Sequence, residues 1–217
     1  MRYEELTIEG RNAVMEAFRS GKTIDKLFVL DGCQDGPVRT IVREAKKYDT
    51  IINYVAKERL DQMSETGKHQ GVIAYAAAYE YAEVEDMLKL AEERGEDPFL
   101  ILLDNIEDPH NLGAIIRTAN LAGAHGVIIP KRRAVGLTAT VAKTSAGALN
   151  YTPVANVTNL AKTMEELKEK GLWFVCADMG GESMYRLNLK GPIGLVIGNE
   201  GEGVGRLVKE KCDFVAS

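Results

Sequence analysis

Hydrophobic residues along the chain fall into short runs that alternate between two spacings. Over residues 98–217, five continuous apolar runs of strand length are separated by segments in which apolar residues recur every three or four positions. The strand-like runs are 99–104, 126–130, 151–157, 172–178 and 193–199, and the helical segments include 111–123 and 159–171. Continuous apolar strands alternating with helices are typical of a parallel sheet covered on both faces. The pattern predicts an α/β domain over residues 98–217.

Residues 8–75 show the same alternation on a smaller scale. Helical spacing predicts helices over 8–21 and 36–49. Apolar runs predict strands over 26–31, 50–56 and 71–79. These elements predict a compact α/β domain over residues 1–78.

Residues 79–97 separate the two domains and are predicted to contain an acidic helix. Apolar residues recur in this segment at helical spacing, at Val84, Met87, Leu88 and Ala91. The segment holds eight acidic and two basic side chains, so it accounts for the chain's net charge of −5. Both flanking domains are close to neutral, and composition therefore leaves RNA binding open. The helix either joins the two domains or opens the second, and a solvated helix with no further role is the simpler interpretation.

Composition excludes several other classes of protein. No apolar run approaches the roughly 18 residues that a membrane helix needs. The charged N-terminus does not have the pattern of a secretory signal. The cysteines are odd in number and scattered, at Cys33, Cys176 and Cys212, which argues against a disulfide framework and against a zinc site. We therefore expect a cytoplasmic protein without a metal.

The strand that ends at Asp104 is followed by a polar loop and a helix predicted to begin near Asn111. In open parallel sheets, ligands bind at the carboxyl ends of strands. Six residues turn a helix by about 600°, so Asn111 and Arg117 share a face only if Asn111 lies in the loop before the helix. Arg117 emerges from an otherwise apolar helix, so it has either a functional role or an ion pair with Asp104 or Asp108. Both interpretations stay open.

A second strand, 193–199, runs into a glycine-rich loop that contains Glu200 and Glu202. Glycines after a strand allow a tight turn and close approach to a ligand. The spacing loosely matches a dinucleotide fingerprint, but two carboxylates would repel a pyrophosphate. A ligand with positive charge, such as the sulfonium and ammonium groups of S-adenosylmethionine, fits better. Thr144 and Ser145, in a predicted turn ahead of 151–157, either donate to a ligand or cap that turn.

Three segments in this order resemble the motifs of SpoU-type (TrmH-like) RNA 2′-O-ribose methyltransferases of the SPOUT superfamily. They are DNIEDPHNLGAIIRTANLAGAHGVII (104–129), KTSAGA (143–148) and GLVIGNEGEGV (194–204). Residues 8–75, with GRNAVMEAF and HQGVIAY, are similar to the substrate-binding domain that precedes the catalytic domain in many members. The two-domain form most resembles bacterial enzymes that methylate a guanosine ribose in large-subunit ribosomal RNA.

The resemblance implies a homodimer and a catalytic domain with a deep trefoil knot, one of the rare exceptions to unknotted chains. S-adenosylmethionine would bind within the knotted loops. Asn111 and Arg117 match the catalytic pair of the first motif, and Glu200 matches the acid of the second. The expected cofactor contacts are Thr144, Ser145, Ile197, Gly198 and Asn199. The family also has a third motif, placed beyond KCDFVAS (211–217), which would complete the knot and cover the adenosine.

For the chemistry, we expect Arg117 to grip a neighbouring phosphate and to stabilise the developing alkoxide, with Asn111 orienting it and Glu200 as its partner. RNA, ribosomal rather than transfer RNA, is the expected partner of the first domain, and the basic side chains expected to contact it include Arg11, Arg39, Arg43, Lys46 and Lys47. The main alternative is a non-catalytic RNA-binding or ribosome-assembly factor with the same fold. A dehydrogenase-like enzyme fits poorly, because DNIEDPHNLG (104–113) contains a single glycine.

Overall fold

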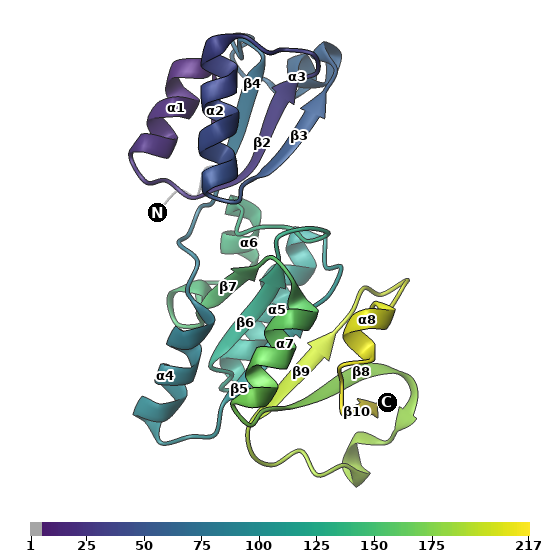
Figure 1. Cartoon of the computed structure of the whole chain (residues 1–217). Helices are drawn as coiled ribbons and strands as arrows, with labels where there is room; N and C mark the ends of the chain where they lie inside the picture. The colour runs from purple at the N-terminus through teal and green to yellow at the C-terminus, as the bar shows by residue number, and fades with distance from the viewer. Residues whose placement is uncertain (1–5) are drawn as a thin grey trace. The chain divides into compact units, whose positions relative to one another are not determined.

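The computed structural model describes residues 6–217, and these residues form two compact α/β units (Figure 1). Unit 1 contains the described residues up to Glu80 together with Gly136–Ala139. Unit 2 contains Tyr81–Val135 and Thr140–Ser217. The break at residue 80 lies two residues beyond the predicted end of the first domain.

Unit 1 contains a four-stranded sheet in the order β1-β4-β2-β3. Its strands are β1 (Leu6–Glu9), β2 (Ile24–Leu30), β3 (Ile51–Val55) and β4 (Val72–Ala76). β2 and β3 are parallel, whereas β4 runs antiparallel to both β1 and β2. The helices α1 (Arg11–Arg19) and α2 (Gly36–Lys47) lie side by side over this sheet (Figure 1). Their buried side chains Val14, Phe18, Val38 and Ile41 form the core of the unit with strand residues such as Leu27.

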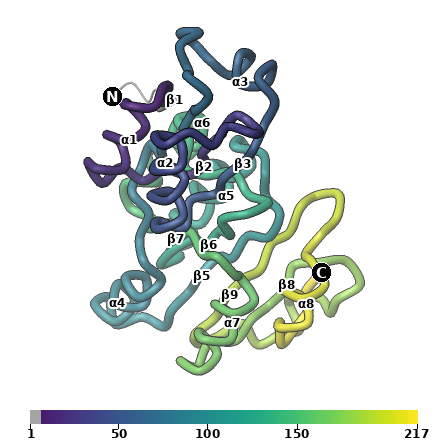
Figure 2. The backbone as a smooth tube through the Cα atoms, turned by 45° about the horizontal axis from the view of Figure 1, so that its top comes forward, coloured from purple at the N-terminus to yellow at the C-terminus, as the bar shows by residue number. Residues whose placement is uncertain are grey.

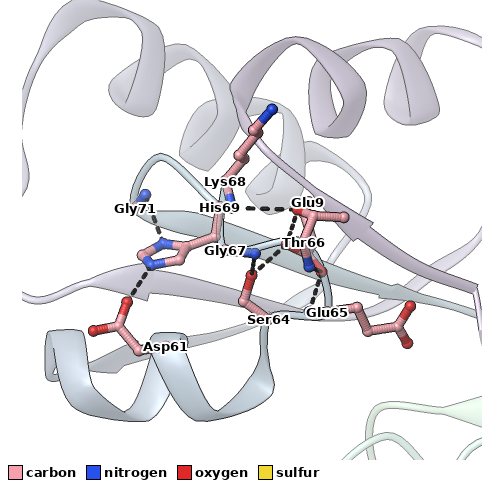
Figure 3. A network of polar contacts seen from close by, with 9 residues as sticks. All are labelled: Glu9, Asp61, Ser64, Glu65, Thr66, Gly67, Lys68, His69 and Gly71. Carbon is pink, nitrogen blue, oxygen red and sulfur yellow. Dashed lines mark hydrogen bonds and ion pairs between the residues drawn. The ribbon is translucent and has the colours of Figure 1, made fainter.

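Every helix and strand predicted for residues 8–79 is present, and β1 and the short helix α3 (Lys57–Met63) are additional. Glu9, at the end of β1, holds the loop that follows α3 (Figure 3). Its carboxylate accepts hydrogen bonds from Ser64 Oγ at 2.5 Å, from the Glu65 backbone N–H at 2.6 Å and from Thr66 Oγ1 at 2.8 Å. Burial acts to raise the pKa of Glu9, but these hydrogen bonds together hold it below the usual glutamate value.

His69 fixes the other end of the same loop. Its side chain is only 7% exposed. Nδ1 accepts a hydrogen bond from the Gly71 backbone N–H at 3.0 Å, so the ring proton lies on Nε2, which donates to Asp61 Oδ1 at 2.9 Å (Figure 3). The imidazole is thus a structural link between α3 and the start of β4.

Unit 2 contains a six-stranded sheet in the order β10-β8-β9-β5-β6-β7, and every neighbouring pair is parallel. Its strands are β5 (Phe99–Leu103), β6 (Gly126–Pro130), β7 (Val154–Val157), β8 (Trp173–Glu182), β9 (Ile193–Ile197) and β10 (Phe214–Ala216). The five predicted strands and the parallel sheet are confirmed. In Figure 2 the chain end lies beside β8, where β10 adds an edge strand.

One face of this sheet is covered by α4 (Val84–Arg94) and α7 (Leu160–Glu169). Met87 of α4 is fully buried and lies so close to β6 that a Cβ built on Gly126 would stand 2.2 Å from its sulfur. The helix starts with a capping box between Glu83 and Asp86 and ends at Gly95 in the left-handed conformation. The acidic segment therefore supplies the first helix of unit 2 and part of its core.

The opposite face is covered unevenly. The helix α5 (Pro109–Leu121) packs over β5 and β6 and buries Leu112, Ile116 and Ala119. Farther along the sheet, Trp173 of β8 is 55% exposed and Leu195 of β9 is half-buried. Within residues 6–217, the prediction of a sheet covered on both faces therefore holds for only part of this face.

The three cysteines carry free thiols. Burial raises the pKa of Cys176, and it raises the pKa of Cys212 to about 12, so both thiols stay protonated at neutral pH. Among the described residues, no helix combines the length and the apolar character needed to cross a membrane.

Replacing Glu9 tests how far its carboxylate stabilises unit 1. Because the pKa of Glu9 is lowered, its stabilisation is present above the ordinary value of 4.5 and is lost as the pH falls through the folded-state pKa. At neutral pH, Glu9→Gln should lower the free energy of unfolding by about 1 kcal/mol. Chemical denaturation at neutral and acidic pH measures this difference, which should shrink in acid. The exposed Glu16 of α1 has no side-chain partner among the described residues, so Glu16→Gln is the control, and an equal effect of both variants would contradict the assignment.

Candidate active site at the carboxyl edge of the parallel sheet

The neighbouring strands β5 and β9 end side by side at one edge of the unit 2 sheet. Leu103 of β5 pairs with Ile197 of β9. From β5 the chain continues to β6 on one side, and from β9 it continues past β8 to β10 on the other side. A crevice outside the carboxyl ends of such strands is where open α/β sheets bind ligands. The loops that follow β5 and β9 therefore flank the candidate site.

Two hydrogen bonds join these loops although they are far apart in the sequence. Asp104 Oδ2 accepts from the Gly205 backbone N–H at 2.7 Å. Asn199 Nδ2 donates to the Asn105 backbone oxygen at 3.2 Å. The loops after the two strands thus form one surface.

The glycine-rich loop after β9 folds back on itself. The backbone N–H groups of Asn199 and Gly203 each donate to the other residue's oxygen, and Asn199 Oδ1 accepts from the Gly201 N–H at 2.8 Å. A Cβ on Gly198 would stand 2.2 Å from the backbone carbon of Gly203. Only glycine fits at position 198, where Ile197, Gly198 and Asn199 form the predicted strand end. The side chain of Asn199 is occupied in holding the loop.

Acidic groups surround this loop. Asp178 of β8 faces Gly203, where a Cβ would lie 3.6 Å from Asp178 Oδ1. Lys209 of the short helix α8 (Arg206–Lys209) donates to Asp178 at 2.6 Å, which lowers the pKa of Asp178 and raises that of Lys209. Glu200 and Glu202 are exposed and have no side-chain partner among the described residues. The two unpaired carboxylates of this loop suit a ligand that is positively charged where it contacts them.

The helix α5 begins earlier than predicted. Asp108 is its N-cap, with Oδ1 accepting from the His110 N–H at 2.7 Å, and Pro109 is its first residue. Asn111 therefore lies in the first turn of the helix instead of the preceding loop. It stands about 120° around the axis and about 9 Å along it from Arg117. The condition under which the two side chains would share a face is not met.

Arg117 is exposed on α5 and has no ion pair or hydrogen bond in the part of the chain that the structure describes. The alternative of an ion pair with Asp104 or Asp108 is therefore wrong. Among the described residues, no hydrogen bond or ion pair joins Arg117 to Asn111 or to Glu200. Asn111 follows β5 and Glu200 follows β9, but the three side chains are not linked into one cluster.

Thr144 and Ser145 lie at the end of a helix, α6 (Ala139–Thr144), and the expectation that they belong to a turn is wrong for Thr144. Thr144 Oγ1 donates to the Thr140 oxygen at 2.9 Å, and a Cβ on Gly113 of α5 would stand 1.8 Å from it. Ser145 is fully buried and donates to the Ala142 oxygen at 2.9 Å. Both hydroxyls thus donate to backbone oxygens of the preceding turn, and their predicted role in cofactor binding stays a prediction.

Two arginines at the same edge were missed in the sequence. Arg132 and Arg133 follow β6 directly, are exposed and have no partner among residues 6–217. Their loop is fastened to the loop after β5 by a hydrogen bond from the Val135 N–H to the Ile106 oxygen at 3.0 Å. Arg133 has a φ of 54°, which is uncommon for a residue with a side chain. In the sequence, three consecutive basic residues, 131–133, directly follow an apolar strand, and this run could have indicated a basic loop at the strand end.

Comparison with known proteins places both units in one family. Residues 98–217 match the model of the SpoU rRNA Methylase family. Residues 7–82 match the model for RNA 2′-O ribose methyltransferase substrate binding. The Bacillus subtilis (strain 168) protein YacO, assigned to the TrmH family of tRNA/rRNA methyltransferases, is 54% identical over 208 residues, which cover 95% of this chain and 83% of that protein.

Solved structures show the same fold. The SpoU methyltransferase AviRb from Streptomyces viridochromogenes, solved in complex with the cofactor AdoMet, has a TM-score of 0.57 and 22% identity over 98% of this chain and 80% of that chain. The rRNA methyltransferase from Sinorhizobium meliloti has a TM-score of 0.54 and 22% identity over 97% and 77% of the two chains.

Two glycines of the loop after β9 give a matched test of its geometry. Gly198→Ala should lower the free energy of unfolding by about 1–3 kcal/mol, because the new Cβ overlaps backbone that cannot move independently. Gly201→Ala should be tolerated, since its nearest neighbour would be the Asn199 side chain at 3.4 Å. Chemical denaturation of both variants measures the difference. Equal stability of the two variants would show that the close contact between Gly198 and Gly203 is absent in solution.

Proposed function

The chain belongs to the SpoU family of RNA methyltransferases, and we propose that it transfers a methyl group from S-adenosylmethionine to a ribose 2′-hydroxyl, with a guanosine of large-subunit ribosomal RNA as target. Membership follows from the match over residues 98–217 and from 54% identity to the Bacillus protein. The observation that carries the proposal is the pair of motif-bearing loops after β5 and β9, which start side by side and are hydrogen-bonded together.

The residues of the loop after β9 fit S-adenosylmethionine by their charge. Glu200 and Glu202 are exposed and unpaired among the described residues. Asp178 lies close to Gly203, which follows Glu202 in the same loop. Carboxylates favour the sulfonium and ammonium groups of this cofactor and disfavour a pyrophosphate. Ile197, Gly198 and Asn199 form the strand end that would contact it, with Thr144 and Ser145 supporting the adjacent helix. When bound, the cofactor supplies an electrophilic methyl group.

For methyl transfer, the protein must hold the ribose hydroxyl in line with that methyl group and stabilise the oxygen as it loses its proton. Arg117 is the candidate for this work, because its guanidinium is exposed and is not neutralised by any described acid. It would hold the phosphate next to the target ribose and the developing alkoxide. Asn111 and Glu200 would join it only in the complete complex, since neither contacts it in the chain alone.

Basic side chains on both units would contact the RNA. Arg132 and Arg133 lie in the loop after β6, at the same edge of the sheet, and would hold phosphates near the target nucleotide. On α2, Arg39, Arg43 and Lys46 are exposed and have no partner among the described residues. The remaining expected contacts are already engaged in unit 1, as Arg11 pairs with Asp35 at 2.5 Å and Lys47 with Glu44 at 3.9 Å.

A homodimer is part of the proposal. Beside α5 lies a hollow of about 270 Å³ lined by apolar side chains such as Ile101, Ile115 and Leu195, and Leu121 of α5 is 82% exposed. A protruding Leu and an apolar hollow on one surface are what a two-fold interface between identical chains requires. The same face carries the exposed Arg117, so a second chain would also bring new neighbours to that arginine. The knot remains a prediction from the family, and the free thiols support a reducing compartment such as the cytoplasm.

A non-catalytic RNA-binding factor is the second candidate. The separation of Arg117 from Asn111 and Glu200 favours it, because a catalytic cluster is not assembled in the chain by itself. Methyl transfer to RNA distinguishes the two candidates, whereas RNA binding does not.

Arg117 gives the decisive test of the proposed chemistry. Incubating the protein with unmodified ribosomal RNA and methyl-labelled S-adenosylmethionine should yield labelled RNA in which alkali no longer cleaves next to the modified ribose. Arg117→Lys should lower this transfer by roughly 100- to 1,000-fold, because lysine keeps the charge but loses the two-pronged geometry. Cofactor affinity, measured by calorimetry, should stay unchanged. Arg94→Lys, at the exposed end of α4, is the control.

Near-normal transfer by Arg117→Lys would show that Arg117 does not have this role. Cofactor binding by the parent protein without any transfer would support the RNA-binding factor instead. If alkali still cleaves next to the labelled nucleotide, the methyl group is on the base. That result would contradict the ribose as the target but not the transfer of a methyl group to RNA.

Leu121 tests the dimer. Leu121→Asp should convert a dimer into a monomer, because it places a charge at the centre of the proposed apolar contact. Leu207→Asp changes a leucine on α8 that is also well exposed and should leave the dimer intact. Light scattering after gel filtration measures the mass of each. A parent protein that is already monomeric, or a Leu121→Asp variant that stays dimeric, would contradict this interface.

A further inference from the structure

Unit 1 contains a hollow of about 410 Å³ between α2 and the edge strand β3. Its floor is formed by Val38 and Val42 of α2, and one wall is formed by Tyr54 of β3. The loop that follows β2, residues 31–34, and Arg39 complete its lining. We propose that this hollow holds one unpaired base of the RNA substrate, stacked on Tyr54. The inference rests on the proposed function and names the part of the RNA that unit 1 recognises.

Tyr54 has the placement that base stacking requires. β3 is an edge strand of its sheet, with no strand beyond it among residues 6–217. Alternation along the strand puts Tyr54 on the same face as Ile52, which packs against the core beneath the helices. The ring is 54% exposed beside the two valines. Stacking of a base on an aromatic ring is independent of sequence and contributes about 1–3 kcal/mol per base.

The rim of the hollow is held in place before any RNA arrives. The Asp31 N–H donates to the Val55 oxygen at 2.9 Å, which joins the loop after β2 to the end of β3. The Cys33 N–H donates to the Leu30 oxygen at 3.1 Å and closes the turn. Fixed walls reduce the ordering that binding would otherwise require.

The charged side chains at the hollow suggest how a nucleotide would be oriented in it. Arg39, Arg43 and Lys46 recur at positions i, i+4 and i+7 of α2, so they form one exposed stripe that starts at the hollow. This stripe can follow successive phosphates. The exposed Asp31, in the loop joined to the end of β3, would repel a phosphate but could accept hydrogen bonds from the amino group of a base. A nucleotide would therefore enter with its base toward Asp31 and its phosphate toward Arg39.

A site for a single base favours single-stranded RNA. A base within a helix is stacked on both faces and paired along one edge, so it cannot enter a recess in the protein without leaving the helix. Loops and bulges offer bases that are already free. The proposal therefore requires that unit 1 distinguish a single strand from a duplex.

Tyr48 provides a matched control for Tyr54. It is another half-exposed tyrosine of unit 1, at 52%, but it lies past the end of α2 and stacks on Phe18 with ring centres 6.0 Å apart. It does not line the hollow. Replacing Tyr48 removes a comparable amount of exposed aromatic surface without changing the proposed base site.

The test uses the full chain and a short single-stranded RNA that carries the fluorescent base 2-aminopurine, beside the same RNA in a duplex. Tyr54→Leu should weaken single-strand binding by about tenfold and abolish the fluorescence quenching caused by stacking. Tyr54→Phe should keep both properties, and so should Tyr48→Leu. Binding of the duplex should be the same for the parent and for Tyr54→Leu. Circular dichroism confirms that each variant is folded.

If Tyr54→Leu binds and quenches the single strand as the parent does, the base site is overturned while the proposed function stands. Equal losses for the single strand and the duplex would also overturn it, because they would indicate a general effect on RNA contact. If the parent binds neither RNA and transfers no methyl group to ribosomal RNA, the proposed function itself is overturned.

Discussion

The candidate active site depends on the parallel pairing of β5 with β9. Each strand is the neighbour of the other although most of unit 2 lies between them in the sequence, and their ends release two loops at the same point. The side chains of Asp104 and Asn199 each hydrogen-bond to the backbone of the other loop, so the two loops form one surface. The acidic residues after β9, the basic loop after β6 and the start of α5 all take their positions from this edge. Without the pairing, the motif residues would have no common site.

Elements with several buried apolar residues could be predicted, because their apolar pattern follows from burial. β6 has the predicted bounds, and the acidic helix ends at Gly95, which takes the left-handed conformation that glycine adopts readily. β1 and α3 were missed for the opposite reason. α3 buries a single residue, Leu60, and the loop behind it is held by Glu9, which lies more than fifty positions earlier. Such contacts leave no periodic signal in the sequence.

The sequence predicted that the loops after two neighbouring strands lie together, as the structure has them, but the arrangement of the candidate residues within these loops could not be predicted. The Asp108–Pro109 pair marked the start of α5, and giving it full weight would have placed Asn111 inside the helix. The sequence could not show that Thr144 belongs to the helix α6. That position depends on close packing against α5, where Gly113 has no side chain to block Thr144. The sequence also could not show that Arg117 has no partner among the described residues. Asp104 and Asp108 are close to it in the sequence, but neither forms an ion pair with it in the structure.

The position of β9 has a consequence for how the chain folds during synthesis. β5 is the first strand of unit 2 to leave the ribosome, and one of its two edges must stay unpaired until Ile193–Ile197 is made. Throughout that interval an apolar strand has an open hydrogen-bonding edge, which is the surface that recruits strands from other chains. Contacts between distant parts of a sequence also slow folding. We therefore expect the catalytic unit to mature late and to be the part of the chain that most needs protection by chaperones.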